Sequence, residues 1–138
     1  MQTVKEVAAS LNLTEHTVRY YTDKHLIPDL KRDKNNKRLF DEAAINWLLC
    51  IKHLRKCGMP IEDIKVYIDL CLEGESTIEE RYEIMRNQKE VAQAQLEEAK
   101  QRAKYIEDKT KNYYDIMNGV IDYDISSTKQ SIPSFPIN

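Results

Sequence analysis

The sequence TVKEVAASLNLTEHTVRYY, residues 3–21, holds two short amphipathic segments with a tight connection between them. Thr3 and Glu6 have the spacing of a capping box, and apolar residues then recur at helical intervals, which predicts a helix over residues 3–10. Thr14 suits the N-cap of a second helix, whose apolar residues would face inward. Two short helices joined by about three residues indicate a helix-turn-helix, although ordinary core packing also produces such a pair.

Polar residues stand at the start of the second predicted helix. In a helix-turn-helix this end enters the major groove of DNA, where Glu15, His16 and Thr17 would meet base edges. The sequence leaves two interpretations of His16 open. It either donates to an acceptor on a base edge or is an exposed helix residue with no role in binding.

Residues 30–40 predict a basic β-hairpin. Apolar residues at both ends of this segment enclose a polar stretch around Asn35 and Asn36, a dipeptide whose tolerance of positive φ suits a two-residue turn. Only Asp33 opposes the basic side chains of this segment, a density suited to a polyanion, although a solvated loop has the same composition. The basic residues are Lys31, Arg32, Lys34, Lys37 and Arg38.

Two more helices complete the first half of the chain. Asp41 is a good N-cap for a third helix, which stops at Gly58. Pro60 is well placed to begin a fourth helix, and Gly74 marks its end. Four helices and one hairpin therefore form the predicted compact half.

The second half predicts one long helix. Residues 76–118 contain no Pro and no Gly, which permits a helix of ~40 residues and ~60 Å. Alternate steps of four and three residues follow an apolar seam that only Lys89 and Thr110 interrupt, as in a coiled coil. Because the first half of the chain is too small to cover this seam, we expect the seam to pair with a second copy in a homodimer. The pattern does not settle whether the two helices run parallel or antiparallel. The predicted dimerisation residues are Ile78, Tyr82, Met85, Ala92, Leu96, Ala99, Ala103, Ile106 and Tyr113.

Composition narrows the function classes. The chain has 138 residues, 21 Lys and Arg against 23 Asp and Glu, and 41% hydrophobic residues. It has no apolar run near the ~18 residues that cross a bilayer, so we expect a cytoplasmic protein that does not enter the membrane. Three cysteines without a CxxC pair disfavour a disulfide framework and a zinc ribbon. Because phosphate-binding glycine loops and hydrolase motifs are missing too, we expect no enzyme, no metal and no cofactor.

Four motifs follow one another in a distinctive order: TEHTVRYY at residues 14–21, LIP at 26–28, KRLFDE at 37–42 and LRKCGMPIEDI at 54–64. In this order and spacing they resemble the MerR family of transcription regulators across residues 2–72. The resemblance implies a mainly α fold, in which a winged helix-turn-helix precedes a long helix that dimerises as an antiparallel coiled coil. We therefore expect a DNA-binding domain at residues 1–74, a dimerisation helix at 75–118 and a polar, flexible tail at 119–138.

The resemblance also implies roles for individual residues. Arg19 and Tyr20 would lie against DNA, largely on phosphates, while Tyr21 supports the core. Arg38 would touch a backbone phosphate, and the other basic residues of the hairpin would add attraction without base specificity. The predicted DNA-binding residues are Thr14, His16, Thr17, Arg19, Tyr20, Lys31, Arg32, Lys37 and Arg38.

The chain departs from the family pattern at four positions. Lys37 and Phe40 stand where the family often has Tyr, which exchanges hydroxyl groups for one charge and one apolar ring. His25 replaces a Gly after the second helix, at a position that favours positive φ. Pro60 replaces a small hydroxyl residue, so a preset φ takes the place of a side-chain cap.

The resemblance bears on the signal as well. Metal-responsive members carry cysteines at and after the dimerisation helix, whereas this chain has none beyond Cys71. Drug-responsive members carry a large effector domain, whereas only a short polar segment follows Met117. The chain is most similar to the short subgroup associated with aldehyde or electrophile stress, in which some members use a reactive cysteine at the position of His53.

Cys57 and Cys50 are candidate thiol sensors. They lie two turns apart on one face of the third predicted helix. His53, Arg55 and Lys56 would supply the positive charge that activates Cys57. The alternative is that Cys50 and Cys71 are small core residues, the usual place of a free cysteine.

These expectations combine into a regulator that binds a pseudo-palindromic promoter site as a homodimer. The resemblance implies that a stress or small-molecule signal changes the dimer, which bends and untwists the DNA to realign the promoter for RNA polymerase. The alternative is a coiled-coil interaction or adaptor protein, whose helix-turn-helix half docks on protein.

Overall fold

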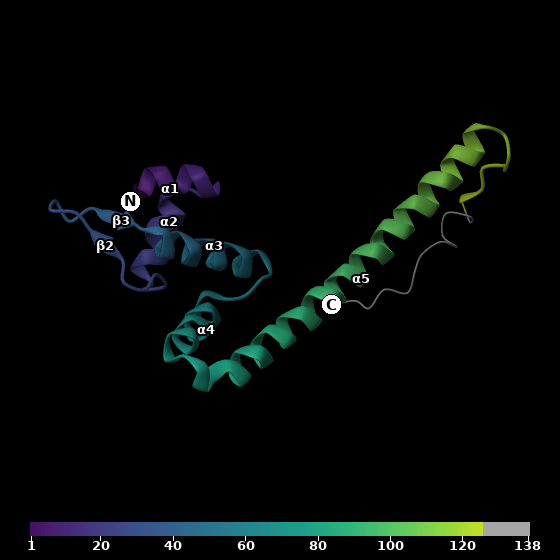
Figure 1. Cartoon of the computed structure of the whole chain (residues 1–138). Helices are drawn as coiled ribbons and strands as arrows, with labels where there is room; N and C mark the ends of the chain where they lie inside the picture. The colour runs from purple at the N-terminus through teal and green to yellow at the C-terminus, as the bar shows by residue number, and fades with distance from the viewer. Residues whose placement is uncertain (126–138) are drawn as a thin grey trace. The chain divides into compact units, whose positions relative to one another are not determined.

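The structure is a computed structural model, and it describes residues 1–125. The chain divides into two compact units, Met1–Gln88 and a second that begins at Lys89. The predicted mainly α architecture with a winged helix-turn-helix is confirmed (Figure 1). In chain order the elements are β1 Gln2–Thr3, α1 Val4–Leu11, α2 Glu15–Asp23, β2 Lys31–Arg32, β3 Arg38–Phe40, α3 Glu42–Lys56, α4 Ile61–Glu73, the 3-10 turn η1 Glu75–Thr77 and α5 Ile78–Met117.

Local capping defines α1 and α2. The Glu6 N–H donates to Thr3 Oγ1 and the Thr3 N–H donates back to Glu6 Oε1, each at 3.2 Å, which completes the predicted capping box. These hydrogen bonds lower the pKa of Glu6. Asn12 ends α1 in the left-handed conformation with φ 55°, and Thr14 caps α2 by accepting from the Thr17 N–H. Asn tolerates left-handed φ because its short polar side chain bonds locally, so the turn between the helices is tight.

The wing is a three-stranded antiparallel sheet with β3 in the centre. Gln2 pairs with Phe40 and Arg32 pairs with Arg38. The predicted two-residue turn at Asn35–Asn36 is wrong, because β2 ends at Arg32 and β3 begins at Arg38, leaving a five-residue loop. Asp33 stabilises this longer loop, since its Oδ1 accepts from the N–H groups of Asn35 and Lys37 at 2.8 and 2.9 Å.

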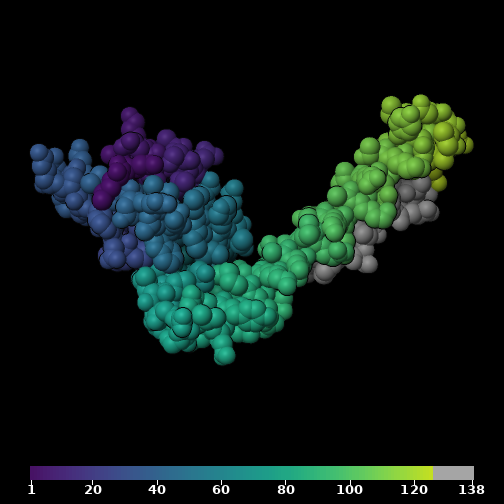
Figure 2. All heavy atoms as spheres, viewed as in Figure 1, coloured from purple at the N-terminus to yellow at the C-terminus, as the bar shows by residue number. Residues whose placement is uncertain are grey.

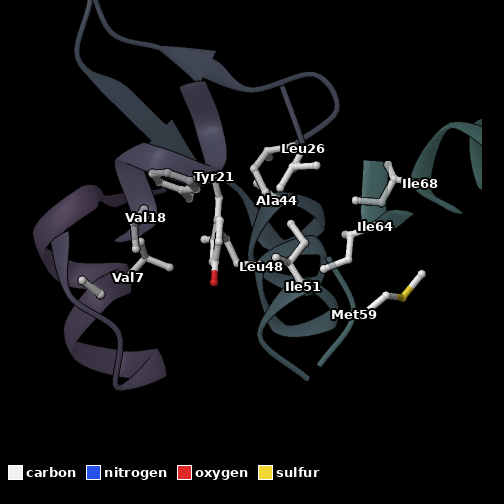
Figure 3. Packing of buried hydrophobic residues seen from close by; sticks show 13 residues of the cluster. Val7, Val18, Tyr21, Leu26, Ala44, Leu48, Ile51, Met59, Ile64 and Ile68 are labelled. Atoms are coloured by element: carbon white, nitrogen blue, oxygen red, sulfur yellow. The ribbon is translucent and has the colours of Figure 1, made fainter. Parts of the chain in front are cut away.

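One hydrophobic core holds the first unit together. Figure 3 shows α3 between two groups of core side chains. Val18 of α2 and Leu48 of α3 lie on one side of α3, and Ile64 of α4 lies on the other. Phe40 of β3 belongs to the same core and is fully buried. Because β3 thereby touches the core that α2 and α3 share, the wing has a defined position relative to α2. The fully buried side chains are Val7, Val18, Leu26, Phe40, Leu48, Ile51 and Ile64, with Ile68 at 1%.

The link between α4 and α5 differs from the expectation of a single long helix from residue 76. The 3-10 turn η1 precedes α5, and the buried Thr77 donates from Oγ1 to the Leu70 carbonyl at 2.6 Å. Arg81 donates from Nη2 to the Gly74 carbonyl at 2.7 Å. Gly74 has φ 91°, a conformation that suits Gly, so the chain changes direction here by a hydrogen-bonded bend.

The departures at His25 and Pro60 are accommodated as expected. His25 has φ 58°, the left-handed conformation predicted for this position. Pro60 has φ −63° and gives α4 no side-chain cap. The domain boundaries at residues 74 and 118 stay predictions, and the part of the predicted tail beyond Ile125 lies outside the described residues.

Candidate nucleic-acid interface

The start of α2 presents two kinds of side chain. Thr14 and Thr17 serve the N-cap, because the Thr14 hydroxyl accepts from the Thr17 N–H at 3.0 Å and bonds the Thr17 hydroxyl at 2.8 Å. His16 is exposed, and Arg19 pairs with Glu15 at 3.2 Å one turn away. The cap fixes the first turn of α2, and its exposed side chains are free to meet a ligand.

Tyr20 and Tyr21 divide as expected between surface and core. Tyr21 is buried, whereas Tyr20 keeps 41% of its surface exposed. The ammonium of Lys24 lies 5.6 Å from the centroid of the Tyr20 ring, a cation–π contact. This contact restrains the Tyr20 ring and places a positive charge beside it.

The basic residues of the wing have different environments. Lys31 pairs with Asp41 at 3.2 Å, and Asp41 also accepts from the Ala44 N–H at the start of α3. The Ala44 hydrogen bond, helped by Lys31, lowers the pKa of Asp41. Arg32 donates to the Asn36 carbonyl at 2.9 Å, which braces the wing loop. Two of the predicted phosphate-binding cations therefore also support the wing itself.

Four of the predicted DNA-binding residues line one open cleft of about 520 Å³ between α2 and the wing. The sheet brings the start of α1 to the same place and adds Lys5, which no sequence motif singles out. Within the lining Glu15 is the one acidic side chain. Figure 2 shows the wing, in blue, at the edge of the first unit next to the purple N-terminal residues. The charged lining residues are Lys5, Glu15, Arg19, Arg32, Lys37 and Arg38.

The cleft does not collect all the predicted contacts. Thr14, His16, Thr17, Tyr20 and Lys31 are not among its lining residues. Four of them belong to the cap or the surface of α2, and Lys31 lies beside Asp41 at the start of α3. The cleft thus gathers cations, whereas the side chains suited to base edges lie beside it on α2.

Arg38 connects the wing with α2. Its Nη2 donates to Asp23 Oδ1 at 2.8 Å, and the side chain is only 20% exposed. Its Nε is buried without a hydrogen-bond partner within the described part of the chain. The hydrogen bond to Asp23 uses Nη2, which leaves other N–H groups of the guanidinium for an acceptor in the cleft, such as a phosphate oxygen.

Comparison with known proteins identifies the family of this fold and cleft. The model of the family described as MerR HTH family regulatory protein matches residues 2–71. An uncharacterised HTH-type transcriptional regulator of Haemophilus influenzae is 30% identical over 111 residues, which cover 80% of this chain and 82% of that protein. The chain belongs to the MerR family of HTH regulatory proteins.

Solved structures of MerR-family regulators share the fold. HiNmlR, a MerR family regulator lacking the sensor domain and bound to promoter DNA, superposes with a TM-score of 0.74 and 28% identity, covering 84% of this chain and 92% of HiNmlR. A MerR family transcriptional regulator from Bacillus thuringiensis gives a TM-score of 0.72 and 35% identity, covering 81% and 98% of the two chains. The similarity to the family thus includes α5 as well as the winged helix-turn-helix.

The α5 helix of this MerR-family chain has no buried residue along its 40 positions. Seven of the nine predicted dimerisation residues are exposed, and Met85 and Ala99 are intermediate. Leu96, near the middle of the helix, is 57% exposed. The predicted seam is therefore an apolar surface that the described part of the chain leaves exposed along α5.

The three thiols lie in different environments. Cys57 is exposed and follows the last residue of α3, whereas Cys50 and Cys71 are intermediate. Burial raises the pKa of the Cys50 thiol, with a smaller contribution from Cys71. Because the thiolate is the reactive form, Cys57 is the better candidate for a sensor. No cluster of three or more His, Cys, Asp or Glu side chains suited to a metal ion occurs in the described residues.

We expect iodoacetamide to modify Cys57 at neutral pH ~10-fold faster than Cys50, because burial and a raised pKa both slow the Cys50 thiol. Timed labelling followed by peptide mass spectrometry measures both rates. Labelling in urea, where all cysteines are accessible, is the control for intrinsic reactivity. Equal rates in the folded protein would contradict this assignment.

Among residues 1–125, no helix combines the length and the apolar character needed to cross a bilayer.

Proposed function

We propose that this MerR-family transcriptional regulator binds promoter DNA as a homodimer over a pseudo-palindromic site. The cleft between α2 and the wing carries the proposal, because Lys5, Arg19, Arg32, Lys37 and Arg38 converge there with one carboxylate. Such a concentration of cations suits the phosphate backbone, which supplies most of the sequence-independent affinity for DNA. The exposed His16 at the start of α2 is then in a position to meet a base edge.

The partner of α5 is a second copy of the chain in this proposal. Two α5 helices in an antiparallel coiled coil would cover the seam of both copies from end to end. A two-fold dimer presents two identical helix-turn-helix units, and the spacing of the half-sites then follows from the length of the coiled coil. The site on DNA is accordingly an inverted repeat.

In this proposal the dimer regulates transcription by deforming its DNA site. A dimer that bends and untwists its site changes the alignment of flanking promoter elements for RNA polymerase. The signal is a stress or a small molecule, and Cys57 is the candidate for receiving an electrophile. Such a regulator acts without catalysis and works where promoter DNA is, in the cytoplasm of a bacterium.

The alternative of a coiled-coil adaptor that docks on protein has less support. An adaptor has no need for a cleft with five cations, whereas a DNA-binding protein does. HiNmlR, whose fold this chain shares, is bound to promoter DNA. Both observations favour DNA as the partner of the first unit.

We expect Arg38→Ala to weaken binding to every DNA sequence and to reduce the slope of log affinity against log salt by about 1. The reason is the loss of one phosphate contact. His16→Ala, on α2 outside the cleft, is the matched variant; it should change sequence preference and leave the salt slope unaltered. Fluorescence anisotropy over a salt series measures both effects. An unaltered affinity and slope in Arg38→Ala would disprove the assignment of the wing.

A further inference from the structure

Asp23 is an acidic residue that pairs with one of the predicted DNA-binding arginines. It is the last residue of α2, and its carboxylate pairs with Arg38 on β3, fifteen residues along the chain. A carboxylate beside a surface for DNA would ordinarily oppose binding through its negative charge. An acidic residue at the C-terminal end of a helix is also unfavourable to the helix dipole.

The two acidic partners of cations in this region lie differently. Glu15 pairs with Arg19 at 3.2 Å and itself lines the cleft. Asp23 pairs with Arg38 at 2.8 Å, but only Arg38 lines the cleft. A phosphate that enters the cleft therefore competes with Glu15 for Arg19, whereas it approaches Arg38 from a side that Asp23 does not occupy.

The exposed fractions of the two side chains also differ in the Asp23–Arg38 pair. The Asp23 side chain is 62% exposed, whereas that of Arg38 is 20% exposed. The long Arg38 side chain is thus enclosed by protein, and the hydrogen bond to Asp23 restrains its guanidinium. Because the bond to Asp23 uses Nη2, other N–H groups of the guanidinium remain for an acceptor in the cleft that Arg38 lines. The rigid fork of a guanidinium can bond a carboxylate and a phosphate through different N–H groups.

We propose that Asp23 is a positioning residue for DNA binding: it fixes the Arg38 guanidinium between the end of α2 and β3, so that wing and helix meet one DNA backbone together. This inference rests on the proposed function. Because Arg38 is already restrained in the folded protein, it loses less conformational entropy on binding DNA than a free arginine side chain would. Asp23 therefore favours DNA binding although it carries a negative charge.

The test compares variants that remove the same negative charge from different places. Fluorescence anisotropy with a labelled duplex of mixed sequence measures phosphate affinity at several salt concentrations. We expect Asp23→Ala to bind roughly 10-fold more weakly, as for the loss of one charge-assisted contact. Glu15→Gln should bind more tightly, because it removes the competitor for Arg19. Asp29→Asn, at an exposed loop position whose φ of 52° suits Asn, is the control for charge alone and should bind slightly more tightly.

A double-mutant cycle distinguishes positioning from a general effect on the fold. In an Arg38→Ala background, Asp23→Ala should cause no further loss of affinity, since there is no guanidinium left to position. The salt slope of Asp23→Ala should fall to that of Arg38→Ala. If Asp23→Ala loses its folded circular dichroism spectrum, the nearly isosteric Asp23→Asn replaces it, with a loss of about threefold because its neutral hydrogen bond is weaker.

The outcomes separate this inference from the proposed function. A wild-type protein that does not bind the duplex at any salt concentration would disprove the proposed function, and the inference with it. A wild-type protein that binds, with Asp23→Ala or Asp23→Asn binding equally well or more tightly, would overturn the role of Asp23 alone. Weaker binding that persists unchanged in the Arg38→Ala background would overturn it as well.

Discussion

Leu96→Lys is expected to convert the proposed dimer into a monomer. Leu96 lies near the middle of α5, so in an antiparallel pair it faces the same region of its partner, and the substitution brings two ammonium groups close together. Burial of two leucine side chains contributes on the order of 4 kcal/mol to association, which corresponds to a roughly 1,000-fold change in the dimer dissociation constant. Sedimentation equilibrium measures this constant directly.

The dimer prediction has a matched control on the same helix. Ala94 is exposed and lies on the side of α5 away from the predicted seam, so Ala94→Lys introduces the same side chain without touching the interface. It should leave the dimer intact. Leu96→Lys should also keep a folded first unit, because Leu96 is exposed and lies beyond Gln88, where that unit ends. A Leu96→Lys protein that remains a dimer of wild-type affinity would contradict the proposed seam.

Phe40→Ala is expected to lower the free energy of unfolding by about 3–5 kcal/mol, because it leaves a cavity in a core that includes residues of all four short helices. Phe40 is fully buried at the end of β3, so its loss also releases the wing from that core. Urea denaturation followed by circular dichroism measures the change. The position often holds Tyr in the family, but Phe40→Tyr would bury a hydroxyl and should be destabilising too.

Leu39→Ala is the control for Phe40→Ala. Leu39 is the neighbouring residue of β3 and is only half-buried, so its truncation should cost less than that of Phe40. Near-equal losses for the two variants, or a loss below ~1 kcal/mol for Phe40→Ala, would show that Phe40 does not anchor the wing.

Features that depend on neighbouring residues could be predicted from the sequence. The capping box at Thr3, the cap at Thr14 and the start of α4 at Pro60 each need only a few consecutive residues. The left-handed conformation of His25 could be predicted only through the family resemblance. The length of α5 followed from the lack of Gly and Pro over residues 76–118.

Features that depend on distant parts of the chain could not be predicted. Strand β1 is two residues long and forms only because Gln2 meets Phe40, a pairing with no local signal. The same pairing brings Lys5 to the cleft. The two-residue turn predicted at Asn35 and Asn36 is wrong because the Asp33 side chain bonds the loop backbone and stabilises a longer loop. The Asp23–Arg38 pair likewise requires the packed positions of α2 and β3.

Selection from genomic DNA tests the central claim most directly. Purified protein is incubated at moderate salt with sheared genomic DNA from its source, and the retained fragments are sequenced. A DNA-binding homodimer predicts enrichment of a few promoter fragments that share one inverted repeat. Uniform, weak retention that disappears with added salt, without a shared repeat, would contradict a sequence-specific regulator.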